Sequence, residues 1–445
     1  MSLSDRERTD ILGAIKKQVL KHHINVGGVS YDAWFKLIEE RTPALLAGDT
    51  EAFETGVQEI LQELGCSHTV FYHESANRFL PQHTINASLR QFEQSGKARW
   101  IFLDVYDGGP ACIAGIRPGD ALLAVDDVAC QPSEMPRFLL GQAYRLQVSS
   151  PGGSNCRDVL VTLPSKKGTK ERPPILEPKS LAHSLIFPNI GLLKIAYFSG
   201  SLGLRFTRAL DAAIKDLKDR GADRLIVDLR GNIGGSLGFA RLASYMCPGK
   251  IPIGNSLTPK RLRSGYDRET LPRVPMPANK FEAVVTLGRF AFRDKSVVLM
   301  TQGLGPQPFH GKIVILVNEW TNSAAEMVTS FAAEHDLATV IGTKTAGNVL
   351  GAANFKVGSG YWMRLPIFGW YTSKGESLDG KGVAPHICVD VDPRQLSAGV
   401  DQQMDKAMEV IRVLAETLPD GPIAGGPKRR ETFAEVGSDL RKSIG

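Results

Sequence analysis

Residues 312–342 read KIVILVNEWTNSAAEMVTSFAAEHDLATVIG, and this stretch decides the class of fold. An apolar run, Ile313 to Val317, is followed by a turn, an amphipathic stretch from about Ser323 to His335, and a second apolar run at 338–342. Apolar strands separated by amphipathic helices are typical of parallel pairing through right-handed crossovers. The stretch therefore predicts part of an α/β core.

The same alternation continues on both sides of this stretch. Apolar strands are expected at 190–198 and 224–229, and the residues between them have helical periodicity. A last helical pattern covers 402–418. The predicted α/β core therefore spans residues 181–418, and a tail rich in glycine, proline and charge follows at 419–445.

The chain ahead of the core divides into three parts. Apolar residues at helical spacing, with a capping residue at Asp49 or Thr50, predict a helical N-terminal subdomain at 1–85. Short β-rich runs around Gly-Pro and Pro-Gly-Asp turns predict a compact domain of strands at 86–165. The basic, proline-rich segment 166–180 is typical of an exposed linker.

The composition excludes several classes of protein. A chain of 445 residues that is 42% hydrophobic has enough apolar surface for two or three globular domains. No apolar run approaches the ~18 to 20 residues that span a bilayer, and the start, MSLSDRERTD, resembles neither a signal peptide nor a transit peptide. The six cysteines are scattered without a CxxC pair, and the net charge of +6 has no aromatic-interleaved basic stripe. We therefore expect a cytoplasmic protein with no membrane or nucleic-acid partner.

Ser323 is the first candidate for chemistry. It follows a buried strand and a short turn, and it stands where the next helix begins. Such a position exposes the hydroxyl at the top of a sheet, and the free N–H groups of the first helical turn, such as that of Ala324, favour a developing negative charge. The alternative is that Ser323 or Asn322 only caps the helix, because serine and asparagine are common caps.

The segment DLRGNIGGS at 228–236 is the second candidate. It is another strand that enters a glycine-rich turn ahead of a helix, so Gly234 or Gly235 could supply a second N–H donor to an oxyanion. Neither GxxxxGK[ST] nor GxGxxG is present, which argues against a phosphate-binding loop. A tight turn that requires a positive φ is the alternative for these glycines.

The segment GGPACIAGIRPGDALLAVDD at 108–127 resembles the signature of a PDZ domain. Together with DLRGNIGG, NSAAE at 322–326 and GTKTAGN at 342–348, it resembles the serine peptidase family that includes the C-terminal processing proteases and the tricorn core. The resemblance covers residues 29–391. It implies a helical N-terminal subdomain, a PDZ domain, and an α/β core related to the Clp protease and crotonase folds.

The general base decides the branch of the family that this chain resembles. The processing proteases carry a lysine where this sequence has Asn348, and Lys344 occupies a position that the family pattern leaves free. The tricorn-like branch uses a histidine in a Leu-x-x-Ser-His motif, and LGCSHTVFY at 64–72 matches it with Ser67 and His68. The resemblance therefore implies a tricorn-like catalytic set with His68 as the base.

The supporting acid departs from the family pattern. The segment SLDGKGVAPHI at 377–387 matches the family's Glu-Gly-x-Gly-Val-x-Pro-Asp, but Asp379 replaces the glutamate and His386 replaces the aspartate. A side chain one methylene shorter must still reach Ser67 or His68. Glu376 is the alternative acid.

The resemblance implies a serine endopeptidase that hydrolyses protein or peptide substrates. Ser323 would attack the scissile carbonyl and His68 would act as base and then acid, supported by Ser67 and Asp379. Gly234 or Gly235, together with Ala324, would hold the oxyanion. No metal or organic cofactor is required, the PDZ domain would assist substrate binding, and the oligomeric state, including a homo-oligomer, stays open.

Two other functions fit the same pattern. A catalytically inactive relative could use this fold to bind peptides or an apolar ligand, and the change at Asp379 is its main support. Acyl-CoA chemistry on a crotonase-like core is the second, although it leaves His68 and the PDZ-like segment unexplained.

Overall fold

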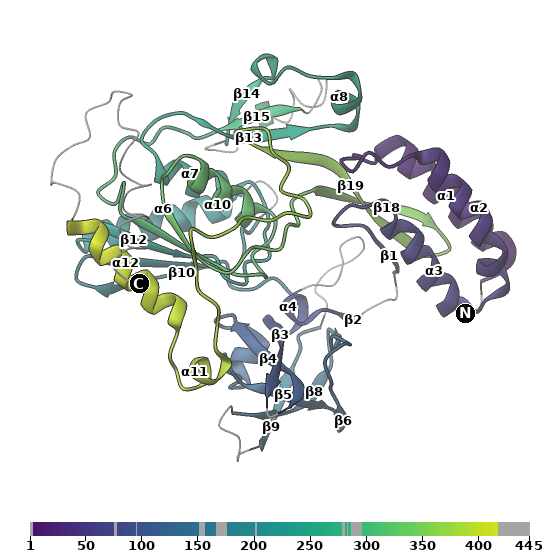
Figure 1. The fold of residues 1–445 in the computed structure, drawn as a ribbon, viewed down its shortest axis with the longest axis horizontal. Helices are drawn as coiled ribbons and strands as arrows, with labels where there is room; N and C mark the ends of the chain where they lie inside the picture. The colour runs from purple at the N-terminus through teal and green to yellow at the C-terminus, as the bar shows by residue number, and fades with distance from the viewer. Residues whose placement is uncertain are drawn as a thin grey trace.

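The computed structural model describes residues 3–74, 78–94, 96–150, 156–165, 176–200, 203–277, 281–282, 284–285 and 296–416. Within these residues helices and several sheets combine into a mixed α/β protein, as the sequence predicts (Figure 1). The predicted tail at 419–445 lies outside the described residues, and the predicted linker at 166–180 is described only from residue 176.

A six-stranded sheet forms the α/β core and confirms the predicted parallel pairing. Its order is β10-β11-β12-β16-β17-β20. Five of its strands run parallel, namely β11, β12, β16, β17 and β20. Strand β10 pairs antiparallel with β11 at one edge. The strands are β10 Leu181–Phe187, β11 Ile190–Ile195, β12 Arg224–Asp228, β16 Ile313–Val317, β17 Thr339–Gly342 and β20 Ile387–Cys388.

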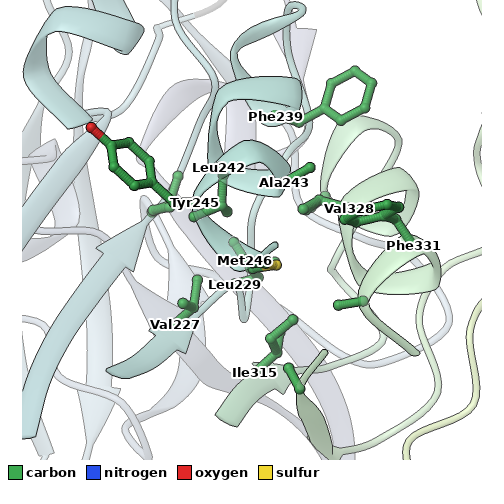
Figure 2. Close-up of a cluster of buried hydrophobic side chains, with 14 of the residues drawn as sticks. Val227, Leu229, Phe239, Leu242, Ala243, Tyr245, Met246, Ile315, Val328 and Phe331 are labelled. Carbon is green, nitrogen blue, oxygen red and sulfur yellow. The ribbon is translucent and has the colours of Figure 1, made fainter. Parts of the chain in front are cut away.

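Helices cover both faces of this sheet, because successive side chains of a strand point to opposite sides. In β16, Ile313, Ile315 and Val317 join the cluster that includes residues of α6, α7 and α10. Figure 2 shows Ile315 beneath side chains of α7 and α10. Val314 and Leu316 join the cluster on the other face, beneath α12. The helices are α6 Leu204–Asp219, α7 Gly238–Met246, α10 Ala324–Glu334 and α12 Gln402–Glu416.

Three helices at the N-terminus pack on a second sheet (Figure 1). They are α1 Asp5–His22, α2 Tyr31–Ala47 and α3 Thr50–Gln62. Asp49 caps α3, as predicted, because its side chain accepts a hydrogen bond of 2.8 Å from the N–H of Ala52. The apolar sides of these helices bury Phe53, Val57 and Ile60 against the sheet.

The second sheet was not predicted from the sequence. Its order is β1-β19-β13-β15-β14, with β18 paired to β19. The long strand β19 is central to this sheet, because it pairs with β1, β13 and β18. The strands are β1 Val70–His73, β13 Pro252–Leu257, β14 Arg273–Pro275, β15 Val297–Met300, β18 Gly351–Gly358 and β19 Tyr361–Thr372.

A third sheet occupies the segment that resembles a PDZ domain. Its order is β3-β4-β5-β8-β9, with β6 paired to β5, and the short helix α5 Pro110–Ile113 follows β4. The strands are β3 Ala87–Gln94, β4 Lys97–Val105, β5 Ala121–Val125, β6 Val128–Ala129, β8 Ala143–Ser149 and β9 Cys156–Thr162. The predicted domain boundaries at residues 85 and 165 stay predictions.

The remaining elements are short. Strands β2 and β7 pair antiparallel. The short elements are β2 Arg78–Phe79, β7 Phe138–Leu139, α4 Pro81–Thr84, α8 Pro259–Ser264, the 3-10 helix Arg268–Thr270 and α11 Pro393–Ser397. Among the described residues, no helix has the length and apolar character that crossing a membrane requires.

Candidate active site

Ser323 stands between β16 and α10 in a strained backbone conformation. Its φ is 53° and its ψ is −116°, a combination of backbone angles that residues other than glycine rarely adopt. Such strain costs of the order of 1 to 3 kcal/mol and persists where the surroundings impose it, frequently at active sites. The sharp turn places Ser323 directly ahead of Ala324, the first residue of the helix.

The carboxylate of Glu326 imposes this turn, and the sequence reasoning missed it. Glu326 is fully buried and accepts hydrogen bonds from the N–H groups of Ser323 (2.9 Å), Gly347 (2.6 Å) and Asn348 (2.9 Å), and from Oγ1 of Thr345 (2.6 Å). Burial raises the pKa of Glu326, and these hydrogen bonds oppose the shift. A glutamate three residues after a helix-capping serine is a recognisable signal, because it reaches back to the cap N–H.

The glycine-rich turn after β12 lies against Ser323. A Cβ at Gly234 would lie 2.7 Å from Cβ of Ser323, so only glycine permits this approach. The N–H of Gly234 donates to Oδ1 of Asn232 at 2.8 Å, so this candidate donor already has an acceptor. Within the described residues, no acceptor is recorded for the N–H groups of Gly235 and Ala324, the other two candidates.

Ser67, His68 and Asp379 form one hydrogen-bonded chain. Oγ of Ser67 donates to Oδ1 of Asp379, and the N–H of Ser67 donates to Oδ2 at 3.2 Å. Oγ of Ser67 lies 2.8 Å from Nδ1 of His68. Asp379 therefore reaches Ser67 although its side chain is one methylene shorter than the family's glutamate. Glu376, the alternative acid, is exposed and lies outside this chain.

His68 has an environment that keeps its imidazole neutral. Burial, and to a smaller extent the positive charge of Arg364, lower the pKa of His68 to about 4. The backbone of His68 has a φ of 64°, so this residue is also held in an unusual conformation. A neutral imidazole near pH 7 has one nitrogen able to accept a proton.

The backbone segment at 347–349 contacts both Glu326, beside Ser323, and the hydrogen-bonded chain of Ser67, His68 and Asp379. The N–H groups of Gly347 and Asn348 bind Glu326, next to Ser323, and the N–H of Val349 donates to Oδ1 of Asp379 at 3.3 Å. The described residues include no hydrogen bond between His68 and Ser323. Backbone N–H groups of one short segment thus bind both Glu326 and Asp379.

The two positions considered for a lysine base are Lys344 and Asn348, and neither has the surroundings of a general base. Lys344 is exposed. Asn348, at the lysine position of the processing proteases, donates from Nδ2 to Oδ1 of Asn322 at 2.8 Å. An amide cannot take a proton from a serine near neutral pH, so Asn348 contributes to the shape of the turn that precedes Ser323.

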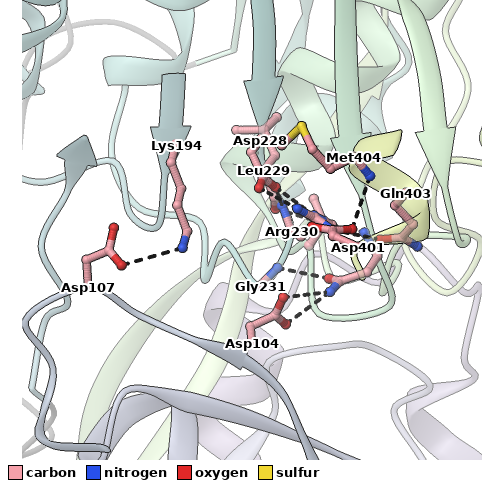
Figure 3. A network of polar contacts seen from close by, with 12 residues as sticks. Asp104, Asp107, Lys194, Asp228, Leu229, Arg230, Gly231, Asp401, Gln403 and Met404 are labelled. Carbon is pink, nitrogen blue, oxygen red and sulfur yellow. Dashed lines mark hydrogen bonds and ion pairs between the residues drawn. The ribbon is translucent and has the colours of Figure 1, made fainter. Parts of the chain in front are cut away.

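The third sheet contacts the loops of the site through Asp104 of β4 (Figure 3). Nδ2 of Asn318, at the end of β16, donates to both carboxylate oxygens of Asp104 at 3.1 and 3.0 Å, and Oδ1 of Asn318 accepts from the N–H of Gly231 at 2.9 Å. The hydroxyl of Tyr106 donates to the carbonyl of Gly231. Burial raises the pKa of Asp104 to about 6, against the hydrogen bonds from Ser88 and Asn318.

The ion pairs of Arg230 fix the start of the glycine-rich turn (Figure 3). Its guanidinium contacts both oxygens of Asp228 at 2.9 and 2.8 Å and Oδ1 of Asp401, ahead of α12, at 2.7 Å. A paired and largely buried guanidinium of this kind holds its neighbours in one geometry. Among the described residues, no group of three histidine, cysteine or acidic side chains is placed to hold a metal ion.

Comparisons with known proteins show which proteins this chain resembles. Residues 189–389 match the family model of peptidase family S41. The chain is 24% identical over 313 residues to the carboxyl-terminal-processing protease of Picosynechococcus sp., which covers 68% of this chain and 64% of the relative. It is 23% identical over 351 residues to the carboxy-terminal processing protease CtpA of Bacillus subtilis, which covers 76% and 64%. The chain therefore spans a little under two thirds of the length of these relatives.

Solved structures show the same fold. The photosystem II D1 C-terminal processing protease has a TM-score of 0.53 at 18% identity, covering 91% of this chain and 97% of its own. Mature CPAF complexed with lactacystin has a TM-score of 0.56 at 14% identity, covering 93% and 98%. Most of the α/β core is therefore similar to peptidase family S41, and the chain shares the fold of these solved proteases.

Proposed function

We propose that this protein is a serine endopeptidase that hydrolyses protein or peptide substrates with Ser323 as nucleophile and His68 as base. The observation that carries the proposal is the chain from Asp379 through Ser67 to His68. A carboxylate only accepts hydrogen bonds, so the Ser67 hydroxyl gives its hydrogen to Asp379. Oγ of Ser67 then accepts from Nδ1–H of His68, which leaves Nε2 as the basic nitrogen.

The reaction follows from these roles. Nε2 of His68 takes the proton of Ser323 as Oγ attacks the scissile carbonyl, and later gives it to the leaving amine. The N–H groups of Gly235 and Ala324 are the donors that remain for the oxyanion, because that of Gly234 is already bound to Asn232. A bound peptide must bring His68 and Ser323 into contact, and catalytic hydrogen bonds commonly tighten only when substrate is bound.

The other parts of the proposal rest on the sequence. The third sheet would be the PDZ domain that binds an extended peptide by strand addition. The match of Ser67 and His68 favours the tricorn-like branch. A cytoplasmic location and a homo-oligomer stay predictions.

Replacing Asp379 tests the proposal. Asp379→Asn keeps the shape but removes the charge that fixes the orientation of the Ser67 hydroxyl, so kcat for peptide hydrolysis should fall by roughly two to four orders of magnitude. Asp379→Glu restores the family's acid and should retain activity. Glu376→Gln is the matched control and should leave kcat unchanged. A small change of kcat in Asp379→Asn together with a large fall of kcat in Glu376→Gln would reject Asp379 as the supporting acid.

A charge on the third sheet tests the proposed substrate domain. Ile113 of α5 is 77% exposed and borders a surface pocket of about 490 Å³, together with Leu160 of β9. Ile116, in the same PDZ-like segment, is only 2% exposed and belongs to the core of this sheet, so a charge there would disturb folding.

Ile113→Glu should therefore raise KM for long peptides more than for short ones, because only long peptides would reach this sheet. Contacts so far from the scissile bond stabilise the bound substrate and the transition state equally, so their loss raises KM and leaves kcat unchanged. Steady-state kinetics on a peptide series of increasing length measures the difference. Equal effects on short and long peptides, in a variant with an unchanged circular dichroism spectrum, would count against a substrate-binding role for this sheet.

A further inference from the structure

One face of the second sheet is not covered by the N-terminal helices. The register pairs Arg364 of β19 with Val70 of β1 and with Asn354 of β18, and it pairs Trp362 with Tyr72 and Lys356. Directly paired residues share a face of the sheet, and adjacent residues along a strand point to opposite faces. The helices bury the opposite face, which carries Phe71, Met363 and Phe355. The uncovered face is therefore basic and aromatic.

This uncovered face adjoins the proposed base. His68 precedes Val70 by two residues, and Val70 lies directly opposite Arg364. The positive charge of Arg364 contributes to the lowered pKa values of both His68 and His83, although burial is the larger cause for each. Arg364 thus stands within electrostatic reach of two histidines, one of which is the proposed base.

Among the residues that the structure describes, the guanidinium of Arg364 has no anionic partner. Its Nε is buried and makes no hydrogen bond within the described part of the chain, and none of the ion pairs there includes Arg364. Oδ1 of Asn354 and Nδ1 of His83 are also buried without a hydrogen-bond partner. A buried cation without a partner is costly, and arginine pairs with carboxylates in a bidentate geometry. Nε–H of Arg364 and an Nδ1–H of His83 can each donate to an anionic ligand, whereas Oδ1 of Asn354 only accepts hydrogen bonds and is no part of the argument for an anion.

We propose that Arg364 binds a carboxylate of the peptide substrate, so that the protein selects peptides with a negative charge near the scissile bond. This inference rests on the proposed peptidase function and names its substrate class. The carboxylate can be the C-terminus of the peptide or the side chain of an aspartate or glutamate. Arg364 is in either case a residue that determines specificity.

A bound carboxylate would also act on His68. It would neutralise the field of Arg364 and so raise the pKa of His68, which makes the imidazole a stronger base in the complex than in the free protein. With an anionic peptide, the acid limb of kcat should therefore lie at higher pH than the acid limb of kcat/KM. The difference should vanish in Arg364→Gln, because the charge that the substrate neutralises is gone.

Equilibrium binding tests the inference without requiring catalysis. In a Ser323→Ala background, fluorescence anisotropy compares labelled peptides of one sequence that end in an acid or an amide and that carry Glu or Gln internally. The anionic peptide should bind about ten- to a hundredfold more tightly than its neutral counterpart, the range of one charge-assisted hydrogen-bonded pair. The pair of peptides that shows the preference identifies the source of the carboxylate.

Three variants separate charge recognition from a general structural effect. Arg364→Gln should remove the preference while leaving the affinity for the neutral peptide unchanged, and Arg364→Lys should retain part of it. Arg41→Gln, which changes a partly exposed arginine paired with Glu59 on the N-terminal helices, should retain all of it. Equal loss for charged and neutral peptides in Arg364→Gln, or an unchanged preference, would overturn the inference.

The result also distinguishes this inference from the proposed function. Arg364-dependent binding of anionic peptides by a protein that hydrolyses none of them supports the inference and rejects the peptidase activity. Hydrolysis of acidic and neutral peptides at equal rates by the wild type supports the activity and rejects the inference.

Discussion

Replacing Ser323 by alanine is expected to abolish peptide hydrolysis, with kcat lower by roughly five to six orders of magnitude. The reason is that Ser323, in its strained position between β16 and α10, is the proposed nucleophile. The fold should persist, because loss of a helix-capping serine costs only about 1 kcal/mol. Turnover of casein or a peptide library by purified wild type and variant measures the effect.

Ser330→Ala is the matched control for this change. Ser330 lies in the same helix, and its hydroxyl donates to the carbonyl of Met327 at 3.0 Å. This variant should retain full turnover. Equal turnover by the wild type and Ser323→Ala, with both proteins folded, would remove Ser323 from the mechanism.

Replacing His68 by alanine should be nearly as severe, because a nucleophile and its base act as a unit. Lys344→Ala should retain substantial activity, since the Lys344 side chain is exposed and the proposed base is His68. Steady-state kinetics of the two variants decides between a histidine and a lysine base. An active His68→Ala variant beside an inactive Lys344→Ala variant would indicate a displaced Ser/Lys pair.

The pH profile gives a second measure of His68. A base works in its neutral form, and burial with the charge of Arg364 lowers the pKa of His68 to about 4. The acid limb of kcat/KM, which reports the free enzyme, should therefore lie near pH 4, well below the ~6.5 of an unperturbed histidine. A limb near pH 6.5 would show that His68 is more exposed to water than the structure has it.

The α/β core could be predicted from sequence because its signals are local. Apolar strands such as Ile313–Val317 and helices such as Ala324–Glu334 each carry their own periodicity, and the crossover rule then fixes the parallel pairing. The cap at Asp49 is equally local. The second sheet could not be predicted, because β1, β13 and β19 lie far apart in the chain and no local pattern specifies their pairing.

Only part of the candidate site could likewise be predicted from the sequence. Ser323, His68 and Asp379 could be named from motifs, and the contact of Asp379 with Ser67 shows how a shorter acid reaches the chain. The role of Glu326 depends on the path of residues 345–348, and that of Asp104 depends on how β4 meets β16. The hydrogen bond that occupies the N–H of Gly234 likewise depends on the conformation of Asn232. The contacts of Glu326 with residues 345–348 and of Asp104 with Asn318 are tertiary, so the sequence alone does not predict them.

The most direct measurement is labelling with a fluorophosphonate probe, followed by mass spectrometry of the labelled peptide. Such a probe reacts with a serine only where a base activates its hydroxyl. The account predicts a single labelled residue, Ser323, in the wild type, with labelling lost in Ser323→Ala and strongly reduced in His68→Ala. Labelling at another residue, or equal labelling of the wild type and Ser323→Ala, would contradict it.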